Sequence, residues 1–144
     1  MTERLLAVQV LYSMAINPDR LDNNINDNLA LIKKIMNEEL AMGGDGNNQE
    51  IIDLLLFYQK QKDTIIEYII HHIAGGDAKW QTLEKILQII LSLGVAEMML
   101  KKQSPAIIIS SWVEVTKSYF SDQSPKLIHA VLDAVNKNIK TPIE

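Results

Sequence analysis

The sequence predicts an all-α protein, and three observations support that prediction. Apolar residues recur every three or four positions along most of the chain, which is the spacing of one helix face. No segment alternates apolar and polar residues as a half-buried strand does. Ser-Pro and Gly-Gly pairs separate the apolar stretches, as expected at helix starts and ends. With 144 residues, of which 47% are hydrophobic, the chain is long enough to bury the core of one domain without disulfides or metal.

Two helices are expected in the first third of the chain. Residues 5–16 are apolar nearly all round, which is typical of a helix buried on most sides, and Asn17 with Pro18 ends it. A second helix is expected from about residue 25 to residue 42. Residues 43–48 are rich in glycine and asparagine and break the helical pattern, so we expect a loop there.

Two long helices are expected next, on either side of a glycine pair. Residues 50–73 keep helical spacing up to Gly75 and Gly76, where glycine supplies the left-handed end of the helix. One further core helix is expected from residue 80 to about residue 101. Its apolar stripe consists of Leu83, Leu87, Ile90, Leu91, Gly94 and Met98.

Two Ser-Pro pairs predict the starts of the last two helices. Ser104 and Ser124 each fit the capping position, and proline fits the first helical position after them. The first of these helices has an apolar stripe of Ile108, Trp112, Val115 and Tyr119. The second has an apolar face of Ile128, Val131, Leu132, Val135 and Ile139 and a polar face of Lys126, His129, Asp133, Lys137 and Lys140.

The chain is expected to form a single domain, residues 1–144, with about six to seven helices. The glycine pair divides these helices into a group at about residues 1–74 and a group at about residues 77–141. Each group alone is too small to be assigned as a domain of its own.

Charge is distributed unevenly along the chain. The formal net charge is −4, which argues against a protein that grips nucleic acid mainly by bulk charge. Residues 1–73 contain 11 acids and 6 bases, whereas residues 74–144 contain 7 acids and 8 bases. Any contact with a polyanion should therefore favour the second half.

The composition also indicates a compartment. The chain has no cysteine, which excludes disulfides, thiolate metal sites and thiol nucleophiles and suits the reducing cytoplasm. The first residues lack the pattern of a signal peptide, and no apolar run approaches the length of a membrane span. We therefore expect a cytoplasmic protein with no membrane contact.

Three segments, in this order, resemble the NusB family. Residues 4–12 (RLLAVQVLY) are similar to the family's opening R-x-x-A-x-Q-x-L-Y helix. Residues 90–98 (ILSLGVAEM) are similar to I-L-R-L-x-x-Y-E-L, and residues 109–117 (ISSWVEVTK) to I-N-E-A-V-E-L-A-K. Residues 124–133 (SPKLIHAVLD) are similar to S-x-K-F-V-N-G-V-L-D. The resemblance spans most of the chain, although residues 20–79 match only in helical pattern.

The resemblance implies a fold of two packed helical bundles and a transcription antitermination factor, bacterial and RNA-binding, that regulates transcription. Such a factor binds the boxA element of nascent ribosomal RNA transcripts together with the ribosomal protein NusE. The pair joins the RNA polymerase antitermination complex and promotes transcription of ribosomal RNA operons. The resemblance leaves open whether the protein is a monomer or a homodimer.

The sequence departs from the family pattern at positions that bear on RNA. The arginine cluster that commonly precedes the first helix is reduced to Arg4. The arginine and tyrosine of the second motif are replaced by Ser92 and Ala96. The family's Asn-Glu and Asn-Gly pairs are replaced by Ser110-Ser111 and His129-Ala130.

Eight residues are candidates for binding RNA: Arg4, Gln9, Tyr12, Lys117, Gln123, Ser124, Lys126 and His129. In the first helix, Gln9 and Tyr12 share a face, where an aromatic ring can stack on a base and an amide can read its edge. The alternative is that both simply pack in a mostly buried helix. We expect Arg4 to be exposed near the helix start and within reach of a phosphate, or else to be an ordinary solvated side chain.

The start of the last helix is the strongest site candidate. Lys117, Ser124 and Lys126 bracket a turn at which a helix N-terminus opens, and its backbone N–H groups and dipole favour phosphate. Gln123 and His129 flank the same surface. The alternative is that Ser124 only caps the helix and that the lysines are only solvated.

No catalytic, metal or cofactor site is predicted. Glu97 lies on an apolar helix face, and we expect it to be paired or hydrogen-bonded to a neighbouring loop in a structural role. Adjacent helix positions point about 100° apart, so His71 and His72 cannot converge on one metal ion. Trp80, Trp112 and Tyr119 lie on or beside core stripes, where packing outweighs base stacking.

Two functional hypotheses remain. The first is an RNA-binding antitermination factor that acts with NusE. The second is a helical protein scaffold that keeps the NusE contact but has weak or no RNA recognition. The net charge and the missing arginines favour this second hypothesis. An RNA-modifying enzyme is excluded by the lack of a strand-bearing cofactor domain with a Gly-rich loop.

Overall fold

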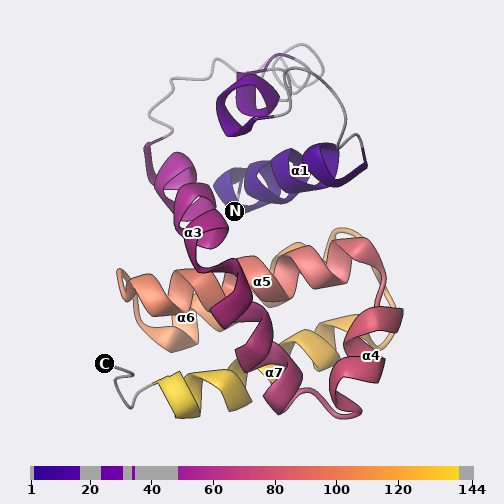
Figure 1. The fold of residues 1–144 in the computed structure, drawn as a ribbon. Coiled ribbons are helices and arrows are strands. Elements are labelled where there is room, and N and C mark those ends of the chain that lie inside the picture. The colour runs from indigo at the N-terminus through magenta and orange to yellow at the C-terminus, as the bar shows by residue number, and fades with distance from the viewer. Residues whose placement is uncertain (1, 17–23, 31–33, 35–48, 140–144) are drawn as a thin grey trace.

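The computed structural model describes residues 2–16, 24–30, 34 and 49–139. The labelled helices are α1 (Thr2–Ile16), α3 (Gln49–His72), α4 (Gly76–Thr82), α5 (Lys85–Leu100), α6 (Pro105–Lys117) and α7 (Ser124–Ile139). Residues 25–30 are helical as well, and no strand occurs among the described residues. The all-α prediction is confirmed (Figure 1).

The expected second helix begins where the sequence indicates. The side chain of Asn24 accepts a hydrogen bond from the backbone N–H of Asp27 at 2.8 Å, which is the geometry of a helix N-cap. Ile25 and Leu29 are buried on the inner face of this helix. The expected helix end at residue 42, the expected loop at 43–48 and the expected stop at Asn17 and Pro18 lie outside the described residues.

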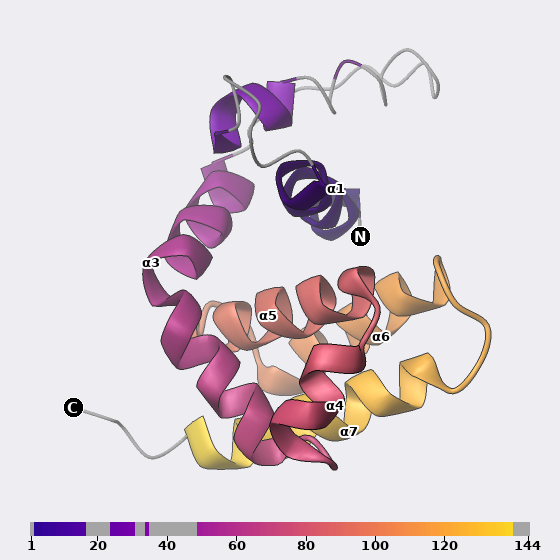
Figure 2. The same cartoon turned by 45° about the vertical axis from the view of Figure 1, so that its right-hand side comes forward.

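Helix α5 forms the centre of the fold and packs against α1, α3, α6 and α7 (Figures 1 and 2). Residues 89–96 of this helix are all buried, which explains why its sequence is apolar on every side. Gly94 allows α7 to approach closely, because a Cβ atom at this position would lie 2.9 Å from both methyl carbons of Leu132. The core is one continuous cluster that extends from α1 to α7.

The predicted single helix at residues 80–101 is wrong, because the chain breaks into α4 and α5. Leu83 has extended backbone angles (φ −69°, ψ 146°). The carbonyl of Trp80 accepts hydrogen bonds from the backbone N–H of Leu83 at 3.3 Å and from the side-chain amide of Gln88 at 2.7 Å. These bonds supply donors to a carbonyl at the end of α4, so the helix can end there although the apolar pattern continues. The break lets Trp80 pack into the core at 7% exposure.

Helix α3 connects the two halves of the molecule. It is kinked at Gln61, whose backbone angles (φ −105°, ψ 16°) leave the helical region. The helix contacts α1 as well as α4, α5 and α7, and in both views it extends from the level of α1 down to that of α7 (Figures 1 and 2). A single helix therefore contributes to the packing of the first and the last helices.

Several expected helix ends and faces are confirmed. Gly75 and Gly76 both have positive φ, 93° and 58°, at the end of α3. Ser104 caps α6, and its hydroxyl accepts a bond from the N–H of Ile107 at 3.4 Å. The predicted apolar face of α7 is the buried one: Ile128, Val131, Leu132, Val135 and Ile139. In the described part of the chain, no helix is long and apolar enough to cross a membrane.

Candidate nucleic-acid interface

The eight candidate residues come from two parts of the fold. Arg4, Gln9 and Tyr12 lie on α1, and the other five lie at the end of α6, in the turn after it and on the first turns of α7. Helix α1 packs against both α5 and α6. Gln9 lies five positions after Arg4, which places the two side chains about 140° apart around α1. The structure therefore does not bring Arg4 together with the face of Gln9.

Arg4 is held inside the fold by an ion pair with Glu97 of α5. Its Nη2 donates to Oε2 of Glu97 at 2.6 Å, and its Nε donates to Oε1 at 3.0 Å. The guanidinium also lies 5.9 Å from the ring centroid of Trp112. The side chain of Arg4 is only 16% exposed. The expectation that Arg4 is an exposed, solvated side chain is therefore wrong.

Glu97 is paired, as expected, although its partners differ from the expected loop. Its Oε1 accepts a second hydrogen bond, 2.8 Å long, from the indole Nε1 of Trp112 on α6. The carboxylate thus joins α1, α5 and α6 through three N–H groups, and we call this set the Arg4–Glu97–Trp112 cluster. A charge buried to this degree is tolerated because it is paired and hydrogen-bonded, which supports a structural role.

Gln9 links α1 to the turn that follows α6. Its Nε2 donates to the phenol oxygen of Tyr119 at 2.7 Å, and both side chains are half-buried. Burial raises the pKa of Tyr119 and the bond from Gln9 opposes that shift, so the phenol is neutral at physiological pH. Tyr119 also packs against Phe120, with ring centroids 6.5 Å apart. Tyr119 is a residue of this surface for which sequence reasoning assigned only packing.

Tyr12 is half-buried and packs against the core. Both side chains therefore pack, as the alternative interpretation expected, and each keeps some exposed surface, so that their contact with RNA stays a prediction. The neighbouring Ser13 donates a hydrogen bond to the buried Asn28 at 2.7 Å, so this side of α1 faces the described turn of the second helix.

The backbone N–H groups at the start of α7 donate their hydrogen bonds to acceptors within the chain. The carboxylate of Asp122 accepts a hydrogen bond from the backbone N–H of Ser124 at 2.8 Å. The N–H groups of Lys126 and Leu127 both donate to the carbonyl of Gln123, at 3.1 and 3.2 Å. Pro125 has no N–H group. Helix α7 therefore begins at Ser124 itself, so the prediction that Ser124 caps it is wrong. The backbone N–H groups that were expected to favour phosphate already have acceptors within the chain.

Asp122 explains this outcome. Hydrogen bonds from the backbone and side chain of Ser124 lower the pKa of the Asp122 carboxyl, so it is ionised at physiological pH. A carboxylate at a helix N-terminus takes the place that an anion would otherwise occupy. The signal in the sequence is an Asp two residues before the Ser-Pro pair, where an Asx turn competes with a serine cap.

Exposed side chains remain available around this turn. Lys117, Gln123, Lys126 and His129 are all exposed. Lys117 lies 3.3 Å from Glu114 in a solvated pair, in which both side chains are more than half exposed. Such a pair contributes little to stability, so the lysine is free to exchange partners. The end of α6, the turn after it and the start of α7 thus carry two exposed lysines, an exposed amide and an exposed imidazole, and the same turn contains Tyr119, the partner of Gln9.

The two imidazole rings of the histidine pair each contact a backbone carbonyl of α3. Nδ1 of His71 lies 2.8 Å from the carbonyl of Glu67, and Nδ1 of His72 lies 2.7 Å from that of Tyr68. Both rings are thus turned back on their own helix. Among the described residues, no three His, Asp or Glu side chains gather in a way that holds a metal ion.

Comparisons with known proteins agree on one family. The family model described as the NusB family matches residues 1–137. A protein from Nitratiruptor sp., named transcription antitermination protein NusB, is 38% identical over 111 residues, covering 76% of this chain and 78% of that protein. A protein of the same name from Sinorhizobium fredii is 28% identical over 147 residues, covering 95% of this chain and 85% of that protein.

One solved structure shares the fold. A chain in the structure described as "Crystal Structure of a Plectonemic RNA Supercoil" superposes with a TM-score of 0.77 and covers 97% of this chain and 95% of that chain. At 23% sequence identity, this likeness establishes the helical fold.

Proposed function

The chain belongs to the NusB family of transcription antitermination proteins, and from this we propose that it binds boxA-type RNA together with the ribosomal protein NusE in the cytoplasm. In this proposal, the pair joins the RNA polymerase antitermination complex and promotes transcription of ribosomal RNA operons. The protein acts by binding and not by catalysis. The observation that carries the proposal is the family match over residues 1–137.

The surface around the α6–α7 turn supports RNA contact. Lys117 and Lys126 are exposed cations that can approach phosphates, and Gln123 and His129 carry groups that hydrogen-bond to bases or sugars. The half-buried ring of Tyr119 belongs to the turn between α6 and α7 and is held by Gln9. A strand of RNA at this turn could meet both cations and an aromatic ring, a combination common in proteins that bind single strands.

The proposed binding depends on NusE because the chain alone has few phosphate contacts. Arg4 is engaged with Glu97, and Asp122 places a negative charge at the start of α7. A partner that adds its own basic surface beside the same strand would raise the affinity without any new contact from this chain. We therefore propose weak binding of RNA by this protein alone and much tighter binding by the heterodimer.

A scaffold that binds NusE without recognising RNA is the second candidate. The same two observations favour it, because an engaged arginine and a filled helix start both weaken the chain's hold on phosphate. The two candidates differ in one respect: the scaffold predicts that RNA affinity of the heterodimer is the affinity of NusE alone.

Capture of NusE by the tagged protein, with and without boxA RNA, separates the two. The proposal predicts that NusE binds, that RNA binds the pair more tightly than it binds NusE alone, and that RNA strengthens the capture. If NusE is captured equally well with and without RNA, and RNA binds the pair no better than it binds NusE, the scaffold is the correct function. Sedimentation of the protein alone decides between monomer and homodimer.

A further inference from the structure

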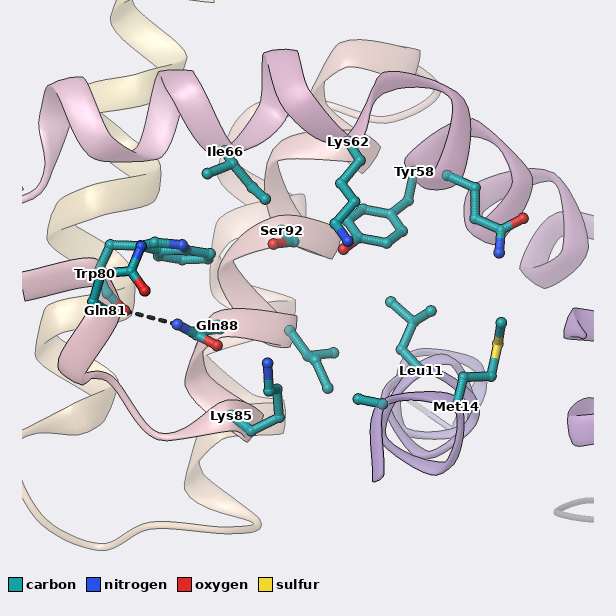
Figure 3. A pocket seen from close by; sticks show the side chains of 13 residues that line it. Leu11, Met14, Tyr58, Lys62, Ile66, Trp80, Gln81, Lys85, Gln88 and Ser92 are labelled. Atoms are coloured by element: carbon teal, nitrogen blue, oxygen red, sulfur yellow. Dashed lines mark hydrogen bonds between the residues drawn. The ribbon is translucent and has the colours of Figure 1, made fainter. Parts of the chain in front are cut away.

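A separate cleft opens on another side of α1. It has a volume of about 620 Å³ and lies between the end of α1, the middle of α3, helix α4 and the start of α5 (Figure 3). Leu11 and Met14 of α1 line it, and Met14 lies about 140° around the helix from Gln9. The cleft is therefore distinct from the surface at the α6–α7 turn. Its volume is in the range of sites for small ligands.

The charge of the cleft is positive. Lys62 of α3 and Lys85 of α5 extend into it from opposite walls (Figure 3). Both lysines are exposed, and neither forms an ion pair with any residue that the structure describes. Among the described residues that line the cleft, none is Asp or Glu. Two unpaired cations facing one space in an otherwise acidic protein favour an anionic occupant.

The rest of the lining can contact a nucleobase as well as an anionic group. Three glutamines, Gln59, Gln81 and Gln88, carry amides that both donate and accept hydrogen bonds. Gln88 uses its N–H on the carbonyl of Trp80, which leaves its side-chain oxygen as an acceptor. The rings of Tyr58 and Trp80 and the side chains of Leu11 and Met14 supply an apolar wall (Figure 3).

We propose that this cleft binds one nucleotide of single-stranded RNA, with Lys62 and Lys85 at its phosphate and the glutamines and aromatic rings at its base. The proposal rests on the proposed function and adds to it a second contact, away from the α6–α7 turn. An acidic peptide would use the two lysines but would leave the glutamine amides and rings without a matching group. A nucleotide uses all three kinds of side chain.

A direct test follows the cleft by NMR while uridine monophosphate is added. The indole N–H of Trp80 and the side-chain amides of Gln81 and Gln88 report on the cleft. The expected result is a saturable shift of these signals. In Lys62→Ala/Lys85→Ala the dissociation constant should rise at least roughly fivefold, because two phosphate contacts are lost.

The matched control is Lys60→Ala/Lys79→Ala. These two lysines are exposed on α3 and α4 but do not line the cleft, so the change in net charge is the same. This variant should bind uridine monophosphate as the parent does. Thermal unfolding should show that both variants fold like the parent, because all four lysines are exposed.

Several results would overturn the inference. Equal loss of affinity in both variants would mean that only net charge matters. Shifts caused equally by inorganic phosphate, or shifts caused by a glutamate-rich peptide and not by the nucleotide, would mean that no base is recognised. If the complex with NusE binds boxA RNA and Lys62→Ala/Lys85→Ala changes neither affinity nor salt dependence, the cleft is not an RNA site and the proposed function stands. If the parent complex binds no RNA, the proposed function fails, and the nucleotide titration still decides whether the cleft binds a nucleotide.

Discussion

The guanidinium of Arg4 and the carboxylate of Glu97 form a two-point ion pair, with donor–acceptor distances of 2.6 and 3.0 Å between residues 93 positions apart. The pair fastens the first helix to the centre of the fold, and Trp112 donates to the same carboxylate from α6. An arginine that reads as an RNA ligand in the sequence is thus part of the packing of three helices.

Glu97→Ala should destabilise the fold by about 2–3 kcal/mol. The change leaves the Arg4 guanidinium and the Trp112 indole N–H partly buried without their acceptor. Because the Arg4–Glu97 pair keeps a small exposure to solvent, the loss of stability is smaller than for a fully buried ion pair. Urea unfolding measures the effect. The double variant Arg4→Ala/Glu97→Ala should lose less stability than the sum of the losses in the two single variants, because both changes break the same contact. Unchanged stability together with lost RNA binding would show that the cluster serves RNA directly.

Gly94→Ala should destabilise the protein by about 1–3 kcal/mol. The added Cβ atom would lie 2.9 Å from both methyl carbons of the fully buried Leu132, so α5 and α7 must shift apart or Leu132 must change rotamer. Combining it with Leu132→Ala, which removes the clashing methyl groups, should cost less than the sum of the two single changes. Thermal unfolding of the three variants checks this. Additive losses would mean that the two positions do not meet.

Asp122→Asn should raise the affinity of the NusE complex for RNA about threefold. It removes a negative charge from the start of α7 and keeps an oxygen that can accept from Ser124, so the start of the helix is preserved. Fluorescence titration with boxA RNA measures the change, and Asp133→Asn, farther along α7, is the control. Equal gains in both variants would assign the effect to net charge alone.

Asp122 should also contribute to acid sensitivity. Its folded pKa lies below the ordinary value of 3.8, so the stability it provides is complete above pH 3.8 and is lost as the pH falls through the lower folded pKa. Asp122→Ala should therefore be less stable than the parent at neutral pH, and the difference should shrink below pH 3.8. Urea unfolding across that range checks it. A difference that stays constant to the lowest pH at which the protein folds would contradict the assigned pKa.

Helix faces were predictable from the sequence because they depend on local spacing. The apolar residues of α7 recur with helical spacing, and the Ser-Pro pair at Ser104 signals the cap of α6 through a bond to a residue three positions away. The family could be identified for the same reason, since its motifs are short and follow one another in order.

The features that the sequence did not reveal have two causes. Some depend on contacts between residues far apart in the chain, and others depend on which of two competing local signals prevails. The pairing of Arg4 with Glu97 is set by how α1 lies on α5, which no local pattern encodes. The break between α4 and α5 needs the Gln88 side chain to satisfy the Trp80 carbonyl. Asp122 and Ser124 both fit the start of α7, and spacing alone does not decide between them. The cleft is assembled from four helices and has no linear motif.

The salt dependence of RNA binding by the complex with NusE tests the central claim most directly. The measurement compares the parent with Lys117→Ala/Lys126→Ala at several salt concentrations, with Lys60→Ala/Lys79→Ala as the control of equal charge. We predict that the first variant binds boxA RNA more weakly, with a slope of log affinity against log salt that is flatter by roughly one to two units, while NusE binding is kept. The control should match the parent. Equal affinity and equal slope in Lys117→Ala/Lys126→Ala would contradict an RNA interface at the α6–α7 turn.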